Sequence, residues 1–542
     1  MFGQMMQMPL MISSLIRHAD RYHGDTQIVS RLTEGGIHRH TYTDAHRRAR
    51  QLARALGSLG VRPGERIGTL AWNNHRHFEI YYAVSGMGAV CHTINPRLFP
   101  KQIAYIINHA DDSYVFFDVS FTELIEGLAP RCPQVKGWVA MTDRDHLPRS
   151  TLDPLSYEEL VNAHSDDFEW PIFDENTAAA LCYTSGTTGN PKGVLYSHRS
   201  TLLHAYAICL PDAFSLSSRE TVLPVVPMFH VNAWGLPYGT PLAGCKLVLP
   251  GPGLDGASLY ELFEQEQITF SAGVPTIWMG LLEHLRTNGL TLSARPRILI
   301  GGAAPPPALM KAFAEEFGVT PLHAWGMTET SPVGTVCSLK GKHLTLSERE
   351  KNVLQAKQGR PLFGVEMEIV DEEGKPLPHD GKAFGDLLVR GPCICASYFK
   401  GEGSDILRPD GWLATGDVAT LDADGYMQIT DRSKDVIKSG GEWISSIELE
   451  NLAAGHPAVA EAAVIGVPHP KWDERPLLVV VVKKNDAGLS RDDLMDFMRD
   501  KVAKWWLPDD VAFVDALPHT ATGKVLKTKL REDFRNHKLP SA

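Results

Sequence analysis

The residues best suited to chemistry lie in one short stretch, residues 183–193, which reads YTSGTTGNPKG. Its glycines permit tight turns and a close approach of the backbone to a ligand. Backbone N–H groups, clustered hydroxyls and one lysine together suit a polyphosphate better than a plain solvated turn. The spacing is not that of a P-loop, because Val194 follows Lys192-Gly193 and no helix signal comes after it. The stretch predicts phosphate contacts from Thr184, Ser185, Gly186, Thr187, Thr188, Gly189 and Lys192.

The elements around this turn indicate an α/β protein. Apolar runs at 177–182 and 193–197 predict two strands, so that the turn forms a hairpin tip. A predicted strand at 66–70 and a helix at 77–89 begin an alternation that continues to about residue 330. This alternation favours a large domain of mostly parallel sheets.

The pattern of residue types changes after about residue 360. Turns rich in Gly, Asp and Pro separate short alternating strands, which predicts a small β-barrel-like subdomain at about 360–431. Helix and strand signals return after a short charged stretch, as in a compact α+β domain. We therefore expect an N-terminal domain at 1–431, a hinge at 432–434 and a C-terminal domain at 435–542.

Composition excludes several classes of partner. The chain has 542 residues and a net charge of −11, from 53 Lys and Arg against 64 Asp and Glu. This balance argues against nucleic acid or an anionic membrane surface. No apolar run approaches the length of a membrane span, and the Met-rich start lacks the basic region of a signal peptide. Eight scattered cysteines are typical of reduced thiols, so a cytoplasmic location is expected.

Three further stretches carry polar residues in suggestive patterns. Trp325 offers an aromatic face for a purine, and Glu329 could hold Mg²⁺ together with Thr184, although alone it would be a solvated carboxylate. Asp417 follows a Gly turn and suits the ribose hydroxyls, although an Asp in a turn is common. The third stretch, residues 432–444, contains two lysines, and taken alone these lysines would be interpreted as surface cations.

Together these stretches resemble, in order, the signatures of the adenylate-forming superfamily, which includes acyl-CoA synthetases, adenylation domains and luciferases. The resemblance extends over essentially the whole chain. It is strongest to bacterial medium- and long-chain fatty acyl-CoA synthetases and to 3-methylmercaptopropionate–CoA ligases. Trp325 stands where the superfamily usually has Tyr, which preserves the aromatic face.

The resemblance implies a role for each site residue. Lys524 is the expected adenylation lysine, Lys434 the hinge and Lys438 a nucleotide contact in the thioester-forming state. Thr184 and Glu329 are the expected metal residues. The remaining nucleotide and CoA residues are Gly302, Ala303, Ala304, His323, Ala324, Trp325, Gly326, Met327, Thr328, Asp417, Arg432, Gly440, Gly441, Glu442 and Trp443. The acid is expected to meet His230, which is also a candidate catalytic residue, and Val231, Trp234, Gly235, Gly302, Trp325 and Pro332.

The implied activity is that of an AMP-forming acid–CoA ligase that uses ATP, Mg²⁺ and CoA. The crowded pocket favours 3-(methylthio)propionate or another short or medium-chain acid. A medium- or long-chain fatty acyl-CoA synthetase, transfer to a carrier protein, light-emitting oxidation and a nucleotide sensor are the alternatives. The C-terminal domain is expected to be mobile, and the protein to form a homodimer. Two further lysines near Lys524, Lys527 and Lys529, are expected to be surface cations.

Overall fold

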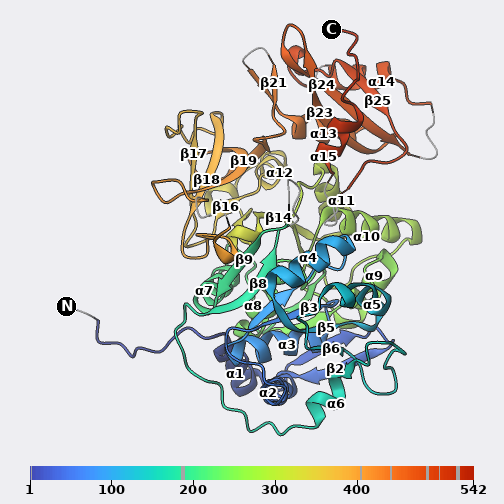
Figure 1. Ribbon diagram of the computed structural model, residues 1–542. Helices are drawn as coiled ribbons and strands as arrows, with labels where there is room; N and C mark the ends of the chain where they lie inside the picture. Colours follow the sequence, from blue (N-terminus) through green and yellow to red (C-terminus); the bar gives the residue numbers. More distant parts are fainter. Residues whose placement is uncertain are drawn as a thin grey trace.

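The computed structural model describes residues 1, 3–184, 190–402, 406–439, 442–483, 488–499, 501–519 and 525–541 (Figure 1). Two large sheets with their helices form the lower body in Figure 1. A smaller sheet and the C-terminal part of the chain lie above them. The expected α/β class is confirmed.

A nine-stranded sheet runs in the order β16-β15-β14-β13-β12-β10-β11-β1-β2. Its central strands pair in parallel, and antiparallel pairs flank them at both ends. The strands are β1 Gln27–Arg31, β2 Ile37–Thr41, β10 Thr221–Pro224, β11 Lys246–Leu249, β12 Phe270–Gly273, β13 Arg297–Ile300, β14 Thr320–Gly326, β15 Val333–Val336 and β16 Arg360–Pro361.

A seven-stranded sheet runs in the order β7-β6-β5-β3-β4-β8-β9. Strands β8 and β9 form an antiparallel hairpin, as the sequence predicted, and the turn between them falls largely outside the described residues. The strands are β3 Arg66–Leu70, β4 Val90–Thr93, β5 Asp112–Phe117, β6 Gly137–Ala140, β7 Leu155–Ser156, β8 Ala178–Tyr183 and β9 Gly193–Ser197.

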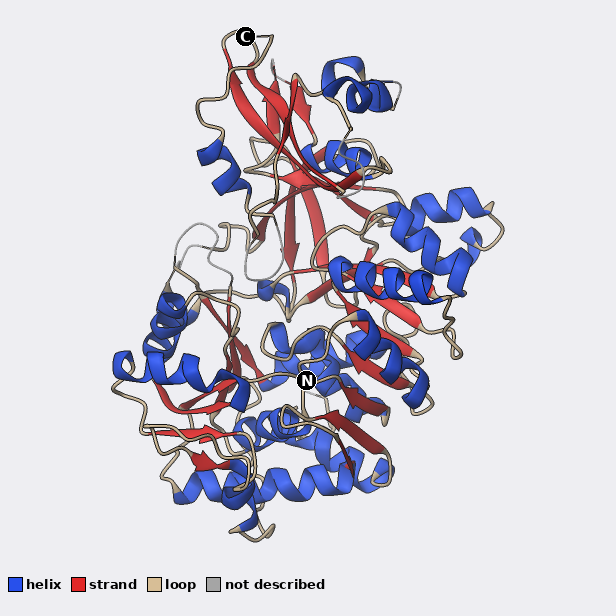
Figure 2. Ribbon diagram, turned by 90° about the vertical axis from the view of Figure 1, so that its right-hand side faces the viewer, coloured by secondary structure: helices blue, strands red, loops and turns tan. Residues whose placement is uncertain are grey.

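Helices cover these sheets (Figure 2). The helix expected at 77–89 is α3, which begins two residues earlier because the side chain of Asn74 accepts a hydrogen bond from His77 N and caps it. The helices of this region are α1 Ile12–His23, α2 Tyr42–Ser58, α3 His75–Gly86, α4 Pro100–Ala110, α5 Thr122–Leu128, α6 Tyr157–Asn162, α7 His198–Cys209, α8 Leu236–Ala243, α9 Gly256–Glu266, α10 Pro275–Asn288, α11 Pro307–Phe317 and α12 Glu348–Gln355. Among the described residues, no helix is both long and apolar enough to cross a bilayer.

The region after residue 360 is an antiparallel sheet of four strands in the order β17-β18-β19-β20. It packs a core of its own around Ile369, Leu387 and Met427. No pairing between β17 and β20 closes it among the described residues, so the barrel-like subdomain is an open sheet. Its strands are β17 Glu366–Val370, β18 Phe384–Arg390, β19 Leu413–Leu421 and β20 Met427–Arg432.

The last part of the chain forms a five-stranded sheet with three helices, at the top of Figures 1 and 2. Its cores lie on both faces of the long hairpin β23–β24. The elements are β21 Ile437–Ser439, β22 Glu442–Ile444, α13 Ser446–Ala454, β23 Val459–His469, β24 Asp473–Val482, α14 Arg491–Arg499, β25 Asp510–Phe513 and α15 Lys527–Asp533.

Candidate active site

The predicted residues surround a cavity of about 630 Å³. Its floor lies where β13 and β14 end, since Gly301 and Gly302 follow β13 and Ala324 to Gly326 close β14. Open α/β sheets place ligand sites at this carboxyl edge. The predicted residues that line the cavity are Thr184, Lys192, His230, Val231, Trp234, Gly302, Ala324, Trp325, Gly326, Met327, Thr328, Glu329, Pro332 and Arg432.

Other predicted residues lie near the cavity without lining it. The ring of His323 turns away, with Nδ1 2.9 Å from the carbonyl oxygen of Ala356, and burial lowers its pKa to about 4. Ala303 and Ala304 lie in the loop after β13, and Gly235 is the N-cap residue directly before α8. Ser185 to Gly189, Gly440, Gly441 and Lys524 fall outside the described residues.

The phosphate end of the cavity combines a cation, a carboxylate and a phenol. Tyr398 donates its hydroxyl to Glu329 Oε1 at 2.6 Å, and Lys192 Nζ lies 4.9 Å from the centre of the Tyr398 ring. Burial, together with the neighbouring Glu329, raises the pKa of the Tyr398 phenol, so the hydroxyl remains a donor. Thr184 accepts a hydrogen bond from Lys192 N at 3.1 Å. This arrangement holds Glu329 in place beside the predicted phosphate turn.

A second group of linked side chains beside the cavity consists of Trp325, Asp417 and Arg432. Trp325 donates Nε1–H to Asp417 Oδ2 at 2.8 Å, and Arg432 Nε lies 2.7 Å from Asp417 Oδ1. Asp417 is buried behind the lining residues Trp325 and Arg432. A carboxylate has about four acceptor positions, so these two contacts do not use them all. Asp417 itself does not line the cavity, so its contact with ribose hydroxyls stays a prediction.

Trp234 lines the apolar end of the cavity. Residues 231–235 are all left-handed, with φ of 42° at Val231, 51° at Asn232, 47° at Ala233, 56° at Trp234 and 81° at Gly235. Such backbone costs about 1–2 kcal/mol for each residue with a Cβ, and strained segments often occur at functional sites. The strained turn presses the indole onto the backbone after β13, where a Cβ on Gly301 would meet Trp234 Cη2 at 2.9 Å.

Lys434 and Lys438 are the predicted residues of the C-terminal part whose side chains are described, and neither lines the cavity. Lys434 is exposed, and Lys438 Nζ lies 3.1 Å from Glu372 Oε1, in the turn after β17. Glu442 and Trp443 lie in the short strand β22. In this arrangement the described C-terminal residues do not reach the nucleotide side of the cavity.

Several lining residues escaped the sequence analysis. Tyr398 is the clearest, because it connects Glu329 and Lys192 but carries no local motif. Tyr105, Asn190 and Glu402 also line the cavity. Thr415 could have been found, since it directly precedes the Gly-Asp pair that ends in Asp417.

Comparison with known proteins identifies the family. The family model "AMP-binding enzyme" matches residues 15–399, and "AMP-binding enzyme C-terminal domain" matches residues 448–524. The chain belongs to the AMP-binding enzyme family. It is 56% identical over 537 residues to a 3-methylmercaptopropionyl-CoA ligase of Ruegeria lacuscaerulensis, with 99% of each chain covered.

Two further members of the family are informative. A medium-chain-fatty-acid–CoA ligase of Ectopseudomonas oleovorans is 50% identical, with 98% of each chain covered. The solved structure of the anthranilate CoA ligase AuaEII in complex with anthranoyl-AMP aligns with a TM-score of 0.85 at 25% identity. That alignment covers 97% of this chain and 98% of the other. The predicted membership of the chain in the adenylate-forming superfamily is confirmed.

Proposed function

We propose that this protein is an AMP-forming acid–CoA ligase whose acid is short or medium in length, with 3-(methylthio)propionate as the best candidate. The main observation behind the proposal is that one cavity is lined by Lys192, Glu329, Trp325 and Trp234 together. It offers a cation and carboxylate for phosphates, an aromatic face for a base and an apolar end for an acid. The close relatives named above support the same reaction.

In the first half-reaction, a carboxylate oxygen of the acid attacks the α-phosphorus of ATP, and pyrophosphate leaves. Two anions must meet, so preorganised cations and donors are the main source of catalysis. Lys524 would neutralise the α-phosphate and the carboxylate. Lys192 and Thr184 would hold the outgoing phosphates, while Trp325 would stack on adenine.

A magnesium ion fits one side of this cavity. Glu329 is held by Tyr398 and lines the same cavity as Thr184. Mg²⁺ commonly uses one or two protein ligands and completes its shell with phosphate oxygens and water. Bound there, the ion would neutralise charge on the departing phosphates.

In the second half-reaction, the CoA thiolate attacks the acyl carbon of the acyl adenylate, and AMP leaves. We propose that the C-terminal domain, residues 435–542, rotates about Lys434 between the two steps and brings Lys438 to the nucleotide. The Lys438–Glu372 pair is compatible with such a motion, because both side chains are more than half exposed and surface pairs contribute little.

The choice of acid rests on the closed apolar end. The cavity has to hold an adenylate as well as the acyl group, and Trp234 is only 8% exposed. A short acid fits in front of the indole, whereas a long chain requires the indole to move off the backbone of Gly301 and Gly302.

The test is AMP release with ATP and Mg²⁺, with and without CoA, over 3-(methylthio)propionate, butyrate, octanoate and palmitate. We expect CoA-dependent AMP release that is highest with the short acids. A maximum at octanoate or palmitate would show that Trp234 opens and would favour a general fatty acyl-CoA synthetase. Pyrophosphate release with no CoA dependence of the AMP would contradict the thioester step and favour a carrier protein as the acceptor.

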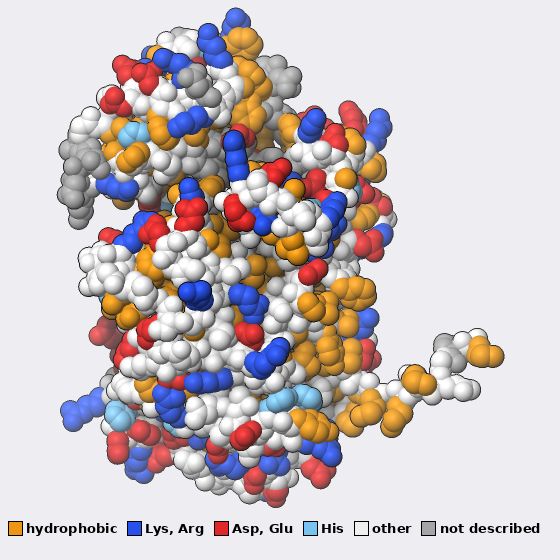
Figure 3. All heavy atoms as spheres, turned by 180° about the vertical axis from the view of Figure 1, so that it is seen from behind, with side chains coloured by type: hydrophobic (Ala, Val, Ile, Leu, Met, Phe, Trp, Pro, Cys, Tyr) orange, Lys and Arg blue, Asp and Glu red, His pale blue; other side chains and the backbone are white. Residues whose placement is uncertain are grey.

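We also propose a homodimer that uses the N-terminal arm. The first residues extend away from the body, and the side chains of Met5, Met6 and Met8 are 81%, 85% and 72% exposed (Figures 1 and 3). Exposed apolar side chains gathered in one segment are typical of an interaction site.

Light scattering should give twice the mass of one chain, and replacing these three methionines by Ser should lower the measured mass. A monomeric full-length chain would contradict this proposal.

A further inference from the structure

Two lysines at the start of α15 differ sharply in their surroundings. Lys527 was expected on the surface, and this expectation is wrong: its side chain is 12% exposed. Its Nζ lies 2.7 Å from Glu450 Oε1 and donates to Ser446 Oγ at 2.5 Å. Lys529, two residues on, is 50% exposed and pairs with Asp533 on its own helix. Only the first lysine therefore connects distant parts of the chain.

The partners of Lys527 reach the strand before the expected hinge. Ser446 begins α13, and its N and Oγ donate to Asp431 Oδ2 at 2.5 Å and Oδ1 at 2.9 Å. Asp431 is buried in β20, the last strand of the four-stranded sheet. Ser445 donates its hydroxyl to the carbonyl oxygen of Thr430. Helix α13 is thus fixed to β20 by contacts that cross residues 432–434.

The charges in this cluster depend on one another. Burial raises the pKa of Asp431 and of Glu450, and the Lys527 ammonium is the main group that opposes this effect on each. One cation therefore serves two carboxyl groups, one on each side of residues 432–434. Asp431 is buried, and the side chain of Glu450 is 19% exposed. An uncharged side chain at position 527 would leave both carboxyl groups without this neighbouring positive charge.

The same lysine lies three residues after Lys524, which falls outside the described residues, and close to the described residues on either side of it. His519 and Val525 form an antiparallel bridge, and Leu526 N donates to the carbonyl oxygen of Pro518 at 2.7 Å. Lys527 follows directly and starts α15. The paired residues 518–519 and 525–526 are therefore joined through Lys527 to α13, and through α13 to β20.

We propose that Lys527 is a positioning residue for the adenylation half-reaction, because it sets α15 and the paired residues 518–519 and 525–526 against β20. This inference rests on the proposed function, in which Lys524 acts in the first half-reaction and is withdrawn in the second. A displacement of about 1 Å far from the reacting atoms can cost on the order of 100-fold in rate. Loss of Lys527 should therefore affect the two half-reactions unequally.

The experiment measures each half-reaction separately on the full chain. ATP–pyrophosphate exchange with the preferred acid reports adenylation, and CoA thioester formation from the preformed acyl adenylate reports the second step. In Lys527→Met we expect adenylation to fall by about 10- to 100-fold, with thioester formation retained within about threefold. Lys524→Ala provides the benchmark for loss of the first step alone.

Two matched variants separate positioning from stability. Lys529→Met removes the same charge from the same helix and should leave both half-reactions unchanged. Lys527→Arg keeps a cation beside Glu450 and should restore most of the adenylation rate. An equal fall of both half-reactions in Lys527→Met, or no fall in either, would overturn the positioning role. Wild-type protein that performs neither half-reaction would instead reject the proposed function.

Discussion

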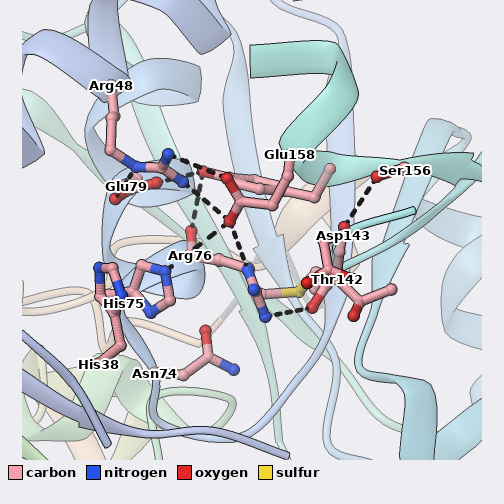
Figure 4. Close-up of polar contacts among 12 residues, drawn as sticks. His38, Arg48, Asn74, His75, Arg76, Glu79, Thr142, Asp143, Ser156 and Glu158 are labelled. Carbon is pink, nitrogen blue, oxygen red and sulfur yellow. Dashed lines mark hydrogen bonds and ion pairs between the residues drawn. The ribbon is translucent and has the colours of Figure 1, made fainter. Parts of the chain in front are cut away.

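Replacing Arg76 by Met should lower the free energy of unfolding by about 3–5 kcal/mol, because it breaks a buried ion-pair network. Arg76 Nη1 lies 2.7 Å from Glu34 Oε1. Its Nε lies 2.8 Å from Glu158 Oε1, and Figure 4 shows these two residues together. Its side chain is 6% exposed. Loss of the guanidinium would leave Glu34 without its ion pair and weaken the hold on Glu158.

The second arginine of the network does not replace the first. Arg48 forms a forked pair with Glu158 at 3.0 and 3.1 Å and also holds Glu79 Oε1 at 2.7 Å (Figure 4). Burial opposes ionisation of Glu158, but Arg48 and Arg76 outweigh it and lower the pKa of that carboxyl group. The network needs both cations because three glutamates share them.

Arg144 provides the matched control for Arg76. It pairs with Glu159 at 3.0 Å, next to Glu158 on α6, but its side chain is 79% exposed. Arg144→Met should change the unfolding free energy by no more than about 1 kcal/mol. Urea unfolding followed by tryptophan fluorescence measures both variants. Equal losses in the two variants would show that burial of the network contributes nothing.

The sequence predicted the parts of the structure that depend on local pattern. The hairpin around Lys192, the parallel sheets and the antiparallel sheet after residue 360 all follow from apolar periodicity and turn residues. The resemblance of the motifs to the adenylate-forming superfamily implied that Thr184, Trp325 and Glu329 share one site, and all three line the cavity. The hairpin and the sheets need only neighbouring residues to specify them, whereas the shared site was predicted through the resemblance.

The features that the sequence did not predict arise from contacts between distant segments. Tyr398 meets Glu329 across 69 positions, and Lys527 meets Ser446 across 81. A lone Tyr or Lys carries no periodic signal, so its burial depends on tertiary packing. The left-handed turn at Trp234 is a further case, because no Gly or Asn pattern marks Val231 or Ala233 as left-handed.

Acidification from pH 6.5 to 5 should lower the stability of the protein. Among the described residues, six of the buried histidines have a pKa that lies far below its usual value, so they are neutral in the fold. Burial lowers the pKa of His40 and His204 to about 3, and of His77, His198 and His323 to about 4. The pKa of His75 also lies well below its usual value because of burial. Unfolding would expose them to water, where imidazole has a pKa of about 6.5.

The sign follows from proton uptake. Below about pH 6.5 the histidines bind protons in the unfolded chain but not in the folded chain, so the free energy of unfolding falls as the pH falls. Asp118 opposes this by one proton, because burial raises its pKa to about 7 and the folded state binds a proton there first. Burial also raises the pKa of five further carboxyl groups, which act in the same direction as Asp118: Glu79, Asp112, Asp431, Glu448 and Glu450. We therefore expect a net loss on the order of a few kcal/mol between pH 6.5 and 5.

Geometry explains why two of these rings resist protonation. His198 Nδ1 accepts a hydrogen bond from Ile12 N at 3.1 Å, and His204 Nε2 accepts one from Val333 N at 3.1 Å. An imidazolium ring has no acceptor nitrogen, so protonation would break each bond as well as bury a charge. His198→Asn keeps an acceptor oxygen in place of the ring nitrogen and cannot be protonated.

Urea unfolding at pH 7.5, 6.5, 5.5 and 5 measures the effect. We expect the pH dependence of the unfolding free energy in His198→Asn to be lower than in the wild type by about one proton. The control is His146→Asn, at an exposed ring whose pKa is raised by its hydrogen bond to Asp143. That ring contributes with the opposite sign, since its stabilisation is lost as pH rises, so its removal should not reduce the acid sensitivity. Equal unfolding free energies at pH 7.5 and 5.5 would contradict the role of the buried histidines, because the unfolded chain would then bind no more protons than the folded one.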